Sequence, residues 1–238
     1  MKLSDVFFSL ASGELSQLNL VDSVTGDIHV DKYRQLIAHV NLGLTDLYTR
    51  FPLKEGRVNV TLESGRITYP ITTREDVGLF PETGAEDFGD DILKIEQVLT
   101  SAGKAFGLND TSDPYSCYTP SMTTLRVSPA VVAKSAEIPG DLITDSLIVV
   151  YRANHPSIVM KAGLVPSRVE LELPISHLQA LLYYIASRVN NPIGITNEFH
   201  AGNSYAAKYE KACELLENVN IRTDQGSQNT RAQRNGWV

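Results

Sequence analysis

Residues 31–62, DKYRQLIAHVNLGLTDLYTRFPLKEGRVNVTL, decide the fold because the hydrophobic period changes within them. In the first part, hydrophobic residues recur every three or four positions, the spacing of one helix face; they are Tyr33, Ile37, Val40, Leu44, Leu47 and Phe51. Asp31 is a suitable N-cap, and Pro52 ends the predicted helix. From Arg57 onward hydrophobic and polar residues alternate, as they do in a strand. The chain therefore combines helices with strands.

Helical spacing also occurs near both ends of the sequence. It predicts a first helix from Leu3 to Leu10 and a third that follows Pro174 and runs to Val189. A fourth helix is expected to begin at Asn203 or Ser204, either of which suits an N-cap. Each predicted helix has one apolar face, so none is stable until that face is covered.

The middle of the chain has the alternation of strands. Residues 58–62 and 67–71 alternate on either side of Glu63-Ser64-Gly65, which predicts a β-hairpin. Further strand candidates are 92–99, 123–127, 147–152 and 168–173. Polar loops rich in Gly, Pro, Ser and Asp separate them, the longest being 107–120.

The predicted fold class is α+β. Four amphipathic helices in residues 1–52 and 174–219 cover one another most simply as a four-helix bundle. Residues 53–173 form an inserted β-rich domain between the two halves of that bundle. Residues 220–238 are polar and without periodicity, so we expect an extended C-terminal arm.

Composition and charge exclude several classes of protein. With 238 residues and 42% hydrophobic residues, the chain can bury a large core, so it is not disordered overall. A net charge of −7 argues against a surface that binds nucleic acid throughout. The longest apolar run, 180–186, is far short of a membrane span. Two cysteines are too few for a disulfide framework and fit a protein made in a reducing cytoplasm.

The sequence carries no recognisable catalytic motif, and we predict no enzyme activity, metal or cofactor. G-x-S-x-G, H-E-x-x-H and G-x-G-x-x-G are absent. The histidines lack metal-ligand spacing and are interpreted as surface or packing residues; they are His29, His39, His155, His177 and His200. Cys213 lies on an apolar stripe and is expected to be a small buried residue. Cys117 sits in a polar loop, where a neighbouring cation would be needed to make it reactive.

Two charge features stand out. Residues 75–91 hold seven acidic residues and no Lys or Arg: Glu75, Asp76, Glu82, Glu86, Asp87, Asp90 and Asp91. They suit a solvated loop, a metal site or a lining that repels a polyanion. The arm carries Arg222, Arg231 and Arg234 together with Trp237, the only tryptophan of the chain. Arg and Trp are frequent interface anchors, so the arm is either a binding segment or a free tail.

Four stretches together resemble the head-to-tail connector adaptors of tailed bacteriophages, also called tail tubular or head-completion proteins. They are DKYRQLIAHVNLGLTDLYTRFP (31–52), LIVVYRANHPSIV (147–159), ELPISHLQALLYYIASRVNN (172–191) and NSYAAKYEKACELLENV (203–219). Within them Asn41 stands where the family has an Asn in its second helix. The residues that fit the later motifs are Tyr151, His155, Pro156, Pro174, Ala180, Leu181, Tyr184, Arg188, Ala206 and Tyr209.

The resemblance implies a structural virion protein, located in the neck or tail and assembled in the host cytoplasm. In that family twelve copies form a ring below the portal, which extends the DNA channel and gives tail or nozzle proteins a docking surface. The implied partners are the portal protein, tail proteins, other copies of the chain and double-stranded DNA that passes without sequence-specific binding; no membrane is implied. On this reading the arm residues contact the portal, and the acidic residues line the DNA channel.

Two other classes remain open from the sequence. One is another neck or tail component, such as a terminator or stopper protein, although four amphipathic helices are more than a terminator usually has. The other is a small cytoplasmic enzyme with a cleft between the helices and the β-rich insertion.

Overall fold

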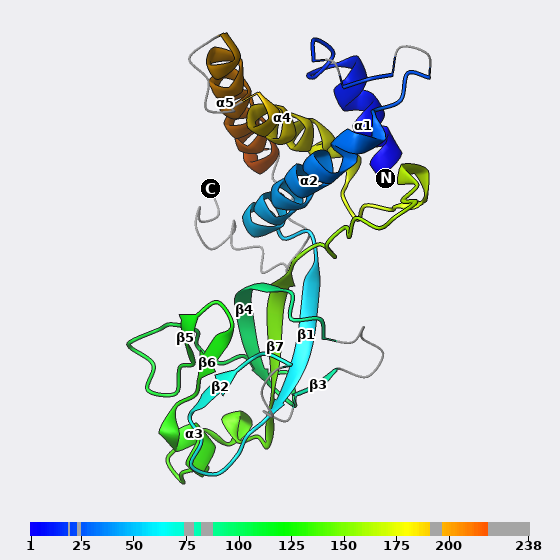
Figure 1. Ribbon diagram of the computed structural model, residues 1–238. Helices are drawn as coiled ribbons and strands as arrows, with labels where there is room; N and C mark the ends of the chain where they lie inside the picture. Colours follow the sequence, from blue (N-terminus) through cyan, green and yellow to red (C-terminus); the bar gives the residue numbers. More distant parts are fainter. Residues whose placement is uncertain (19, 23–24, 74–78, 82–87, 191–196, 219–238) are drawn as a thin grey trace, which may run out of the picture.

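The computed structural model describes residues 1–18, 20–22, 25–73, 79–81, 88–190 and 197–218. It is a mixed α+β fold with the long helices at one end and the strands at the other (Figure 1). The four long helices are α1 (Leu3–Ser12), α2 (Val30–Arg50), α4 (Leu178–Val189) and α5 (Asn197–Asn218). The short α3 (Pro129–Ala133) lies with the strands, and three 3₁₀ turns complete the helical elements: η1 (Gly140–Leu142), η2 (Pro166–Arg168) and η3 (Ile175–His177).

The strands form two antiparallel sheets. The larger has the order β3 (Leu79–Pro81), β1 (Glu55–Thr61), β7 (Ser146–Ala153) and β4 (Ile92–Thr100). The smaller has the order β2 (Thr68–Pro70), β6 (Thr124–Arg126) and β5 (Tyr118–Ser121). The strand candidates at 92–99, 123–127 and 147–152 are thereby confirmed.

The predicted hairpin of residues 58–62 with 67–71 is wrong. β1 pairs with β7 and β3, and β2 pairs with β6 in the other sheet. The turn between them sends the chain from one sheet to the other, and the Tyr69 hydroxyl fixes it by donating to the Arg66 carbonyl at 2.7 Å. Residues 168–173 are not a strand either: Leu171 and Leu173 are buried, but against the helices.

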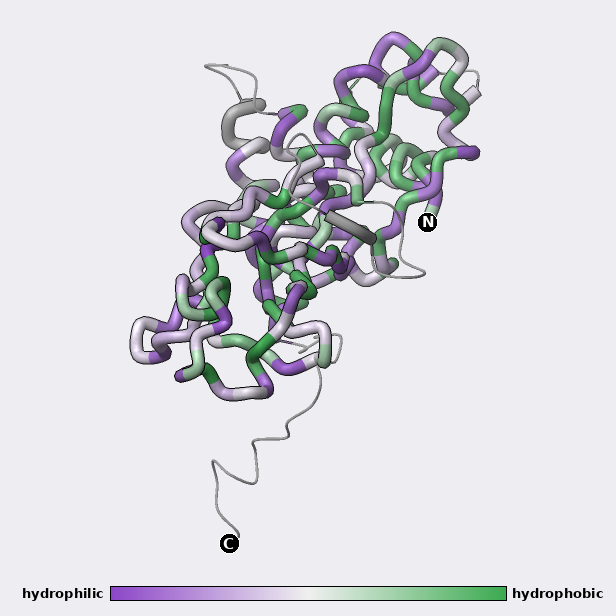
Figure 2. The backbone as a smooth tube through the Cα atoms, turned by 90° about the horizontal axis from the view of Figure 1, so that it is seen from below, coloured by the Kyte–Doolittle hydropathy of each residue, from purple (hydrophilic) through white to green (hydrophobic). Residues whose placement is uncertain are grey.

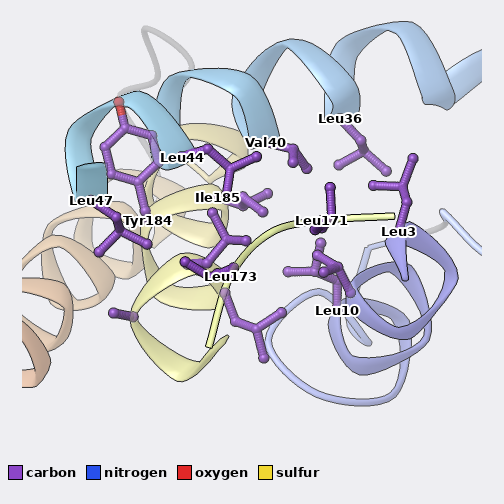
Figure 3. Packing of buried hydrophobic residues seen from close by; sticks show 14 of the residues in the cluster. Leu3, Leu10, Leu36, Val40, Leu44, Leu47, Leu171, Leu173, Tyr184 and Ile185 are labelled. Carbon is purple, nitrogen blue, oxygen red and sulfur yellow. The ribbon is translucent and has the colours of Figure 1, made fainter. Parts of the chain in front are cut away.

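The helix predictions are largely confirmed. The stripe in α1 and the one in α2 are buried, and Figure 3 shows Leu36, Val40, Leu44 and Leu47 pointing from α2 towards Ile185 of α4 and Leu3 of α1. The N-cap of α2 is His29 rather than Asp31, and α5 begins at Asn197, before the expected caps.

The four-helix bundle is the main correction to the predicted fold. All four long helices contribute to one hydrophobic cluster, but they do not pack as a regular bundle. α4 packs against both α2 and α5, whereas α1 contacts α4 and the η2 turn (Figure 1). In a regular bundle, helices alone would bury these apolar faces. Here the extended segment with Ile158, Leu171 and Leu173 buries part of them.

A second hydrophobic cluster fills the β-rich part. It is made by side chains of both sheets and of α3, including Val58, Tyr69, Leu125, Val131 and Val149. Hydrophobic and hydrophilic residues are interspersed along the backbone in both parts (Figure 2). Among the residues described, no helix has the length and hydrophobicity needed to cross a membrane.

Candidate functional site

Most of the predicted site residues lie outside the described residues. This holds for the arm residues Arg222, Arg231, Arg234 and Trp237, and for Glu75, Asp76, Glu82, Glu86 and Asp87 of the acidic segment. Asp90 and Asp91 are described, and both have local partners. Asp90 accepts a hydrogen bond from the Thr73 backbone at 2.7 Å, and Asp91 accepts one from the Tyr151 hydroxyl at 3.2 Å. These two carboxylates therefore fasten the end of the acidic segment to the β-rich part.

Among the residues described, a set of long-range polar contacts lies along one side of α2, where β7 ends and the chain returns to the helical part, and we call it the joint. One side of α2 supplies Asn41, Thr45, Tyr48 and Thr49. Their spacing of four, three and one positions keeps them on one side of the helix. Each contacts the segment between the last residues of β7 and Glu172, so one side of the helix holds this segment at four points.

Asn41 makes the most specific contact of the joint. Its amide Nδ2 donates to the Ile158 carbonyl at 3.0 Å, and its Oδ1 accepts from the Ile158 N–H at 2.9 Å. A single side chain thus satisfies both backbone groups of one residue, which a segment outside any sheet needs when it packs on a core. Two neighbouring contacts add to it: Asn154 Nδ2 donates to Thr45 Oγ1 at 3.1 Å, and the Tyr48 hydroxyl donates to the Glu172 carbonyl.

His155 connects the beginning and the end of the same segment. Its Nδ1 lies 2.6 Å from the Pro156 carbonyl, and its Nε2 accepts from the Glu172 N–H at 3.2 Å. The two contacts require a neutral ring with the proton on Nδ1. Burial lowers the pKa of His155, which favours this neutral form. The imidazole also meets the Tyr48 ring edge-on, with centroids 5.7 Å apart, so the residue has a packing role.

Arg152, which is paired with a carboxylate within the sheet, ties the sheet to the end of α2. Arg152 of β7 lies 2.6 Å from Glu96 of β4 and also donates to the Thr49 carbonyl at 2.5 Å. Both charged side chains are largely buried, with exposed fractions of 13% and 17%. Removing one partner of such a pair would leave the other charge buried and unmatched.

A second polar cluster joins α2 to α5. Arg50 makes two parallel hydrogen bonds to Glu210, at 2.7 and 2.8 Å, and a 3.2 Å ion pair to Asp46. The Tyr209 hydroxyl donates to Asp46, and the Tyr209 ring meets Tyr184 of α4 edge-on at 5.3 Å. α5 is thereby fixed to both α2 and α4.

The cysteines and the other described buried histidine show no arrangement for nucleophilic catalysis. Cys213 is fully buried, as predicted. Cys117 is also buried; burial, reinforced by Asp113, raises the pKa of its thiol to about 12, so the thiolate is suppressed. His177 packs edge-on against Phe51 at 4.8 Å, and burial lowers its pKa. Within the described ranges no cluster of His, Cys, Asp and Glu has the geometry of a metal site.

Sequence reasoning identified part of the joint and missed the rest. It singled out Asn41 and His155, while Thr45, Arg152 and Glu172 were not noticed. One signal was available: Asn41, Thr45 and Thr49 form a polar stripe at four-residue spacing beside the apolar face of α2. No model of a known protein family matches the chain, and a search of curated proteins found no similar sequence.

Proposed function

We propose that this chain is a structural subunit of the neck of a tailed bacteriophage. About twelve copies form a closed ring below the portal, extend the DNA channel and present a surface to tail or nozzle proteins. The four helices with their shared core form the ring wall, and the inserted β-rich part provides a second contact surface.

One observation carries the proposal: the four stretches that resemble connector adaptors bond directly to one another. Asn41 of the first stretch holds Ile158 of the second. His155 of the second accepts a hydrogen bond from Glu172 of the third. Tyr209 of the fourth donates to Asp46 of the first. The four stretches therefore belong to one connected framework, as is needed if they together form the wall of a ring subunit.

The contacts of the joint also suit a subunit that forms the wall of a ring. Hydrogen bonds from Arg152 to Thr49 and from Asn154 to Thr45 limit rotation of the β-rich part against α2, and the buried Arg152–Glu96 pair orients Arg152 for its contact. A subunit that contacts neighbours through both parts needs such a fixed relation, because each ring interface joins two different patches.

In this proposal the C-terminal arm, residues 220–238, contacts the portal. The test mixes the purified full-length protein with the portal protein of the same virus and follows co-sedimentation. A variant without residues 220–238 is expected to lose portal binding and keep its helical circular dichroism. A matched variant with Arg222, Arg231 and Arg234 changed to Gln separates the contribution of charge from that of chain length. Unchanged portal binding by the shortened variant would exclude the arm as the anchor.

The acidic segment is proposed to keep DNA from adhering to the channel. Carboxylates near the duplex repel its phosphates over about 10 Å at ordinary salt. The test leaves Asp90 and Asp91 intact, because both have local partners. It changes the remaining acids, Glu75, Asp76, Glu82, Glu86 and Asp87, to Gln or Asn and measures DNA release from assembled particles. Slower release is expected, and an unchanged rate would remove the channel-lining role.

A further inference from the structure

The helical part carries an open groove of about 400 Å³ that the joint does not use. It lies between α1, the residues that lead into α2, and the region of η2. Its lining is mainly apolar and includes Phe7, Phe8, Ile28, Val30, Tyr33 and Val165. The Phe7 and Tyr33 rings contact each other with centroids 5.2 Å apart, which gives the groove an aromatic wall.

Two of its apolar side chains are largely exposed. Phe8 is 70% exposed and Val30 is 69% exposed, although they border the same groove. Covering such neighbouring residues is favourable by about 25 cal/mol for each Å² removed from water. Asp27 stands exposed in the lining. Burial, with the charge of Asp27 adding to it, raises the pKa of Tyr33. The groove thus combines aromatic surface with one carboxylate, a site for an aromatic side chain that has a cation nearby.

We propose that this groove binds Trp237 of the same chain, with Arg234 pairing with Asp27. The arm contains the only tryptophan of the chain, and Arg234 precedes it by three residues, about 10 Å of extended chain. The charges are complementary. The arm has three arginines against Asp224, whereas the groove segments 4–11 and 26–33 have three acids against Lys32.

The arm is long enough to reach the groove. Glu210 of α5 is bonded to Arg50, the last residue of α2, while Val30, the first residue of α2, borders the groove. Glu210 is therefore separated from the groove by the length of α2, about 30 Å, and the arm starts eight helical residues later, so it begins within about 42 Å of the groove. The 19 residues from 219 to 237, taken as a flexible chain, have a root-mean-square span of about 24 Å and a full extension of about 63 Å.

The length of the arm favours docking of Trp237 in the groove of its own chain over docking in the groove of a second copy. A linker of this length gives an effective concentration of about 1 mM. A contact with a dissociation constant of about 0.1 mM would then be about 90% occupied within one chain, but scarcely occupied by another copy at micromolar concentration. This docking requires no portal and holds whether or not the protein is a connector; in a connector, the portal would displace Trp237 from the groove.

The test uses the emission of Trp237 in the full-length protein, excited selectively and challenged with a soluble quencher. The groove variants are Phe8→Ser and Val30→Ser, and Asp27→Asn tests the ion pair. Ile175→Ser is the matched control, because Ile175 is 75% exposed and does not line the groove. All four changes are at exposed positions, so circular dichroism should show the same folded protein.

Wild type and Ile175→Ser are expected to show blue-shifted, protected emission at every protein concentration. Phe8→Ser and Val30→Ser should each lower the ratio of docked to free Trp237 about tenfold. Asp27→Asn should lower it a few-fold, and less at high salt. Three results would overturn the proposal: freely quenched Trp237 in wild type, protection that survives both apolar groove changes, or protection that appears only as concentration rises, which would make a second copy the occupant.

Discussion

Replacing Asn41 by Ala should destabilise the whole protein, although Asn41 is a polar residue on a helix. The change removes two hydrogen bonds, at 3.0 and 2.9 Å, and leaves the N–H and the carbonyl of Ile158 without their partner. Each lost bond costs about 1 kcal/mol, and an unpaired buried backbone group adds further cost. The expected loss is about 2–4 kcal/mol, which corresponds to a fall in melting temperature of about 4–16 °C for a chain of this size.

The assay is denaturant unfolding followed by circular dichroism, with Gln35→Ala as the control. Gln35 is exposed on the same helix, so its replacement should change the free energy of unfolding by less than about 0.5 kcal/mol. Asn41→Asp is informative as well, because it keeps the acceptor for the Ile158 N–H but sets a second oxygen against the Ile158 carbonyl. If Asn41→Ala behaved like the Gln35 control, the contact between Asn41 and Ile158 would not hold the chain that follows β7 to α2 as described.

Three further changes test the packing. Acid should destabilise the protein, because burial lowers the pKa of His155 and His177 in the folded state. As the pH drops from about 6.5, the unfolded chain therefore binds protons at these residues before the folded protein does, and the free energy of unfolding should fall. Equal denaturation midpoints at about pH 7.5 and about pH 5.5 would contradict this prediction. Gly43→Ala should cost about 1–3 kcal/mol in thermal unfolding, because a Cβ there would lie 2.7 Å from a side chain of α4, whereas Gly140→Ala meets open space and should be neutral. Cys117 should react with a thiol reagent only on unfolding, since burial raises its pKa to about 12; rapid labelling of folded protein would refute its burial.

The helices were predictable because their signals are local. In α1 the stripe Leu3, Val6, Phe7 and Leu10 lies within eight residues, and every member is buried. The class of the fold follows from the same local patterns. Strand pairing is not local: β1 bonds to β7, whose residues follow it by about ninety positions, and nothing in residues 58–71 distinguishes that partner from the adjacent β2.

The alternation of hydrophobic and polar residues in 168–173 shows a different limit of prediction from sequence. Leu171 and Leu173 face a core on one side, as strand residues do, but the core belongs to the helices. The backbone partner at Glu170 is Lys2, beside α1, in a single isolated bridge. Alternation reports burial on one side, and it does not report whether a neighbouring strand is present.

The candidate site was predictable in its residue types and not in its contacts. Asn41 was singled out by resemblance, but its partner Ile158 is 117 positions away and is bound through its backbone, which leaves no mark on the sequence. The groove beside Phe8 and Val30 was missed for the same reason. Its walls come from three separate segments, each of which looks like an ordinary helix start or turn.

Electron microscopy of the full-length protein mixed with the portal of its virus tests the connector proposal most directly. The expected image is a second ring, of about twelve subunits, stacked coaxially on the portal with an open central channel. Portal rings that remain bare at saturating protein, together with thermal stabilisation of this chain by a small metabolite, would contradict the proposal and favour an enzyme.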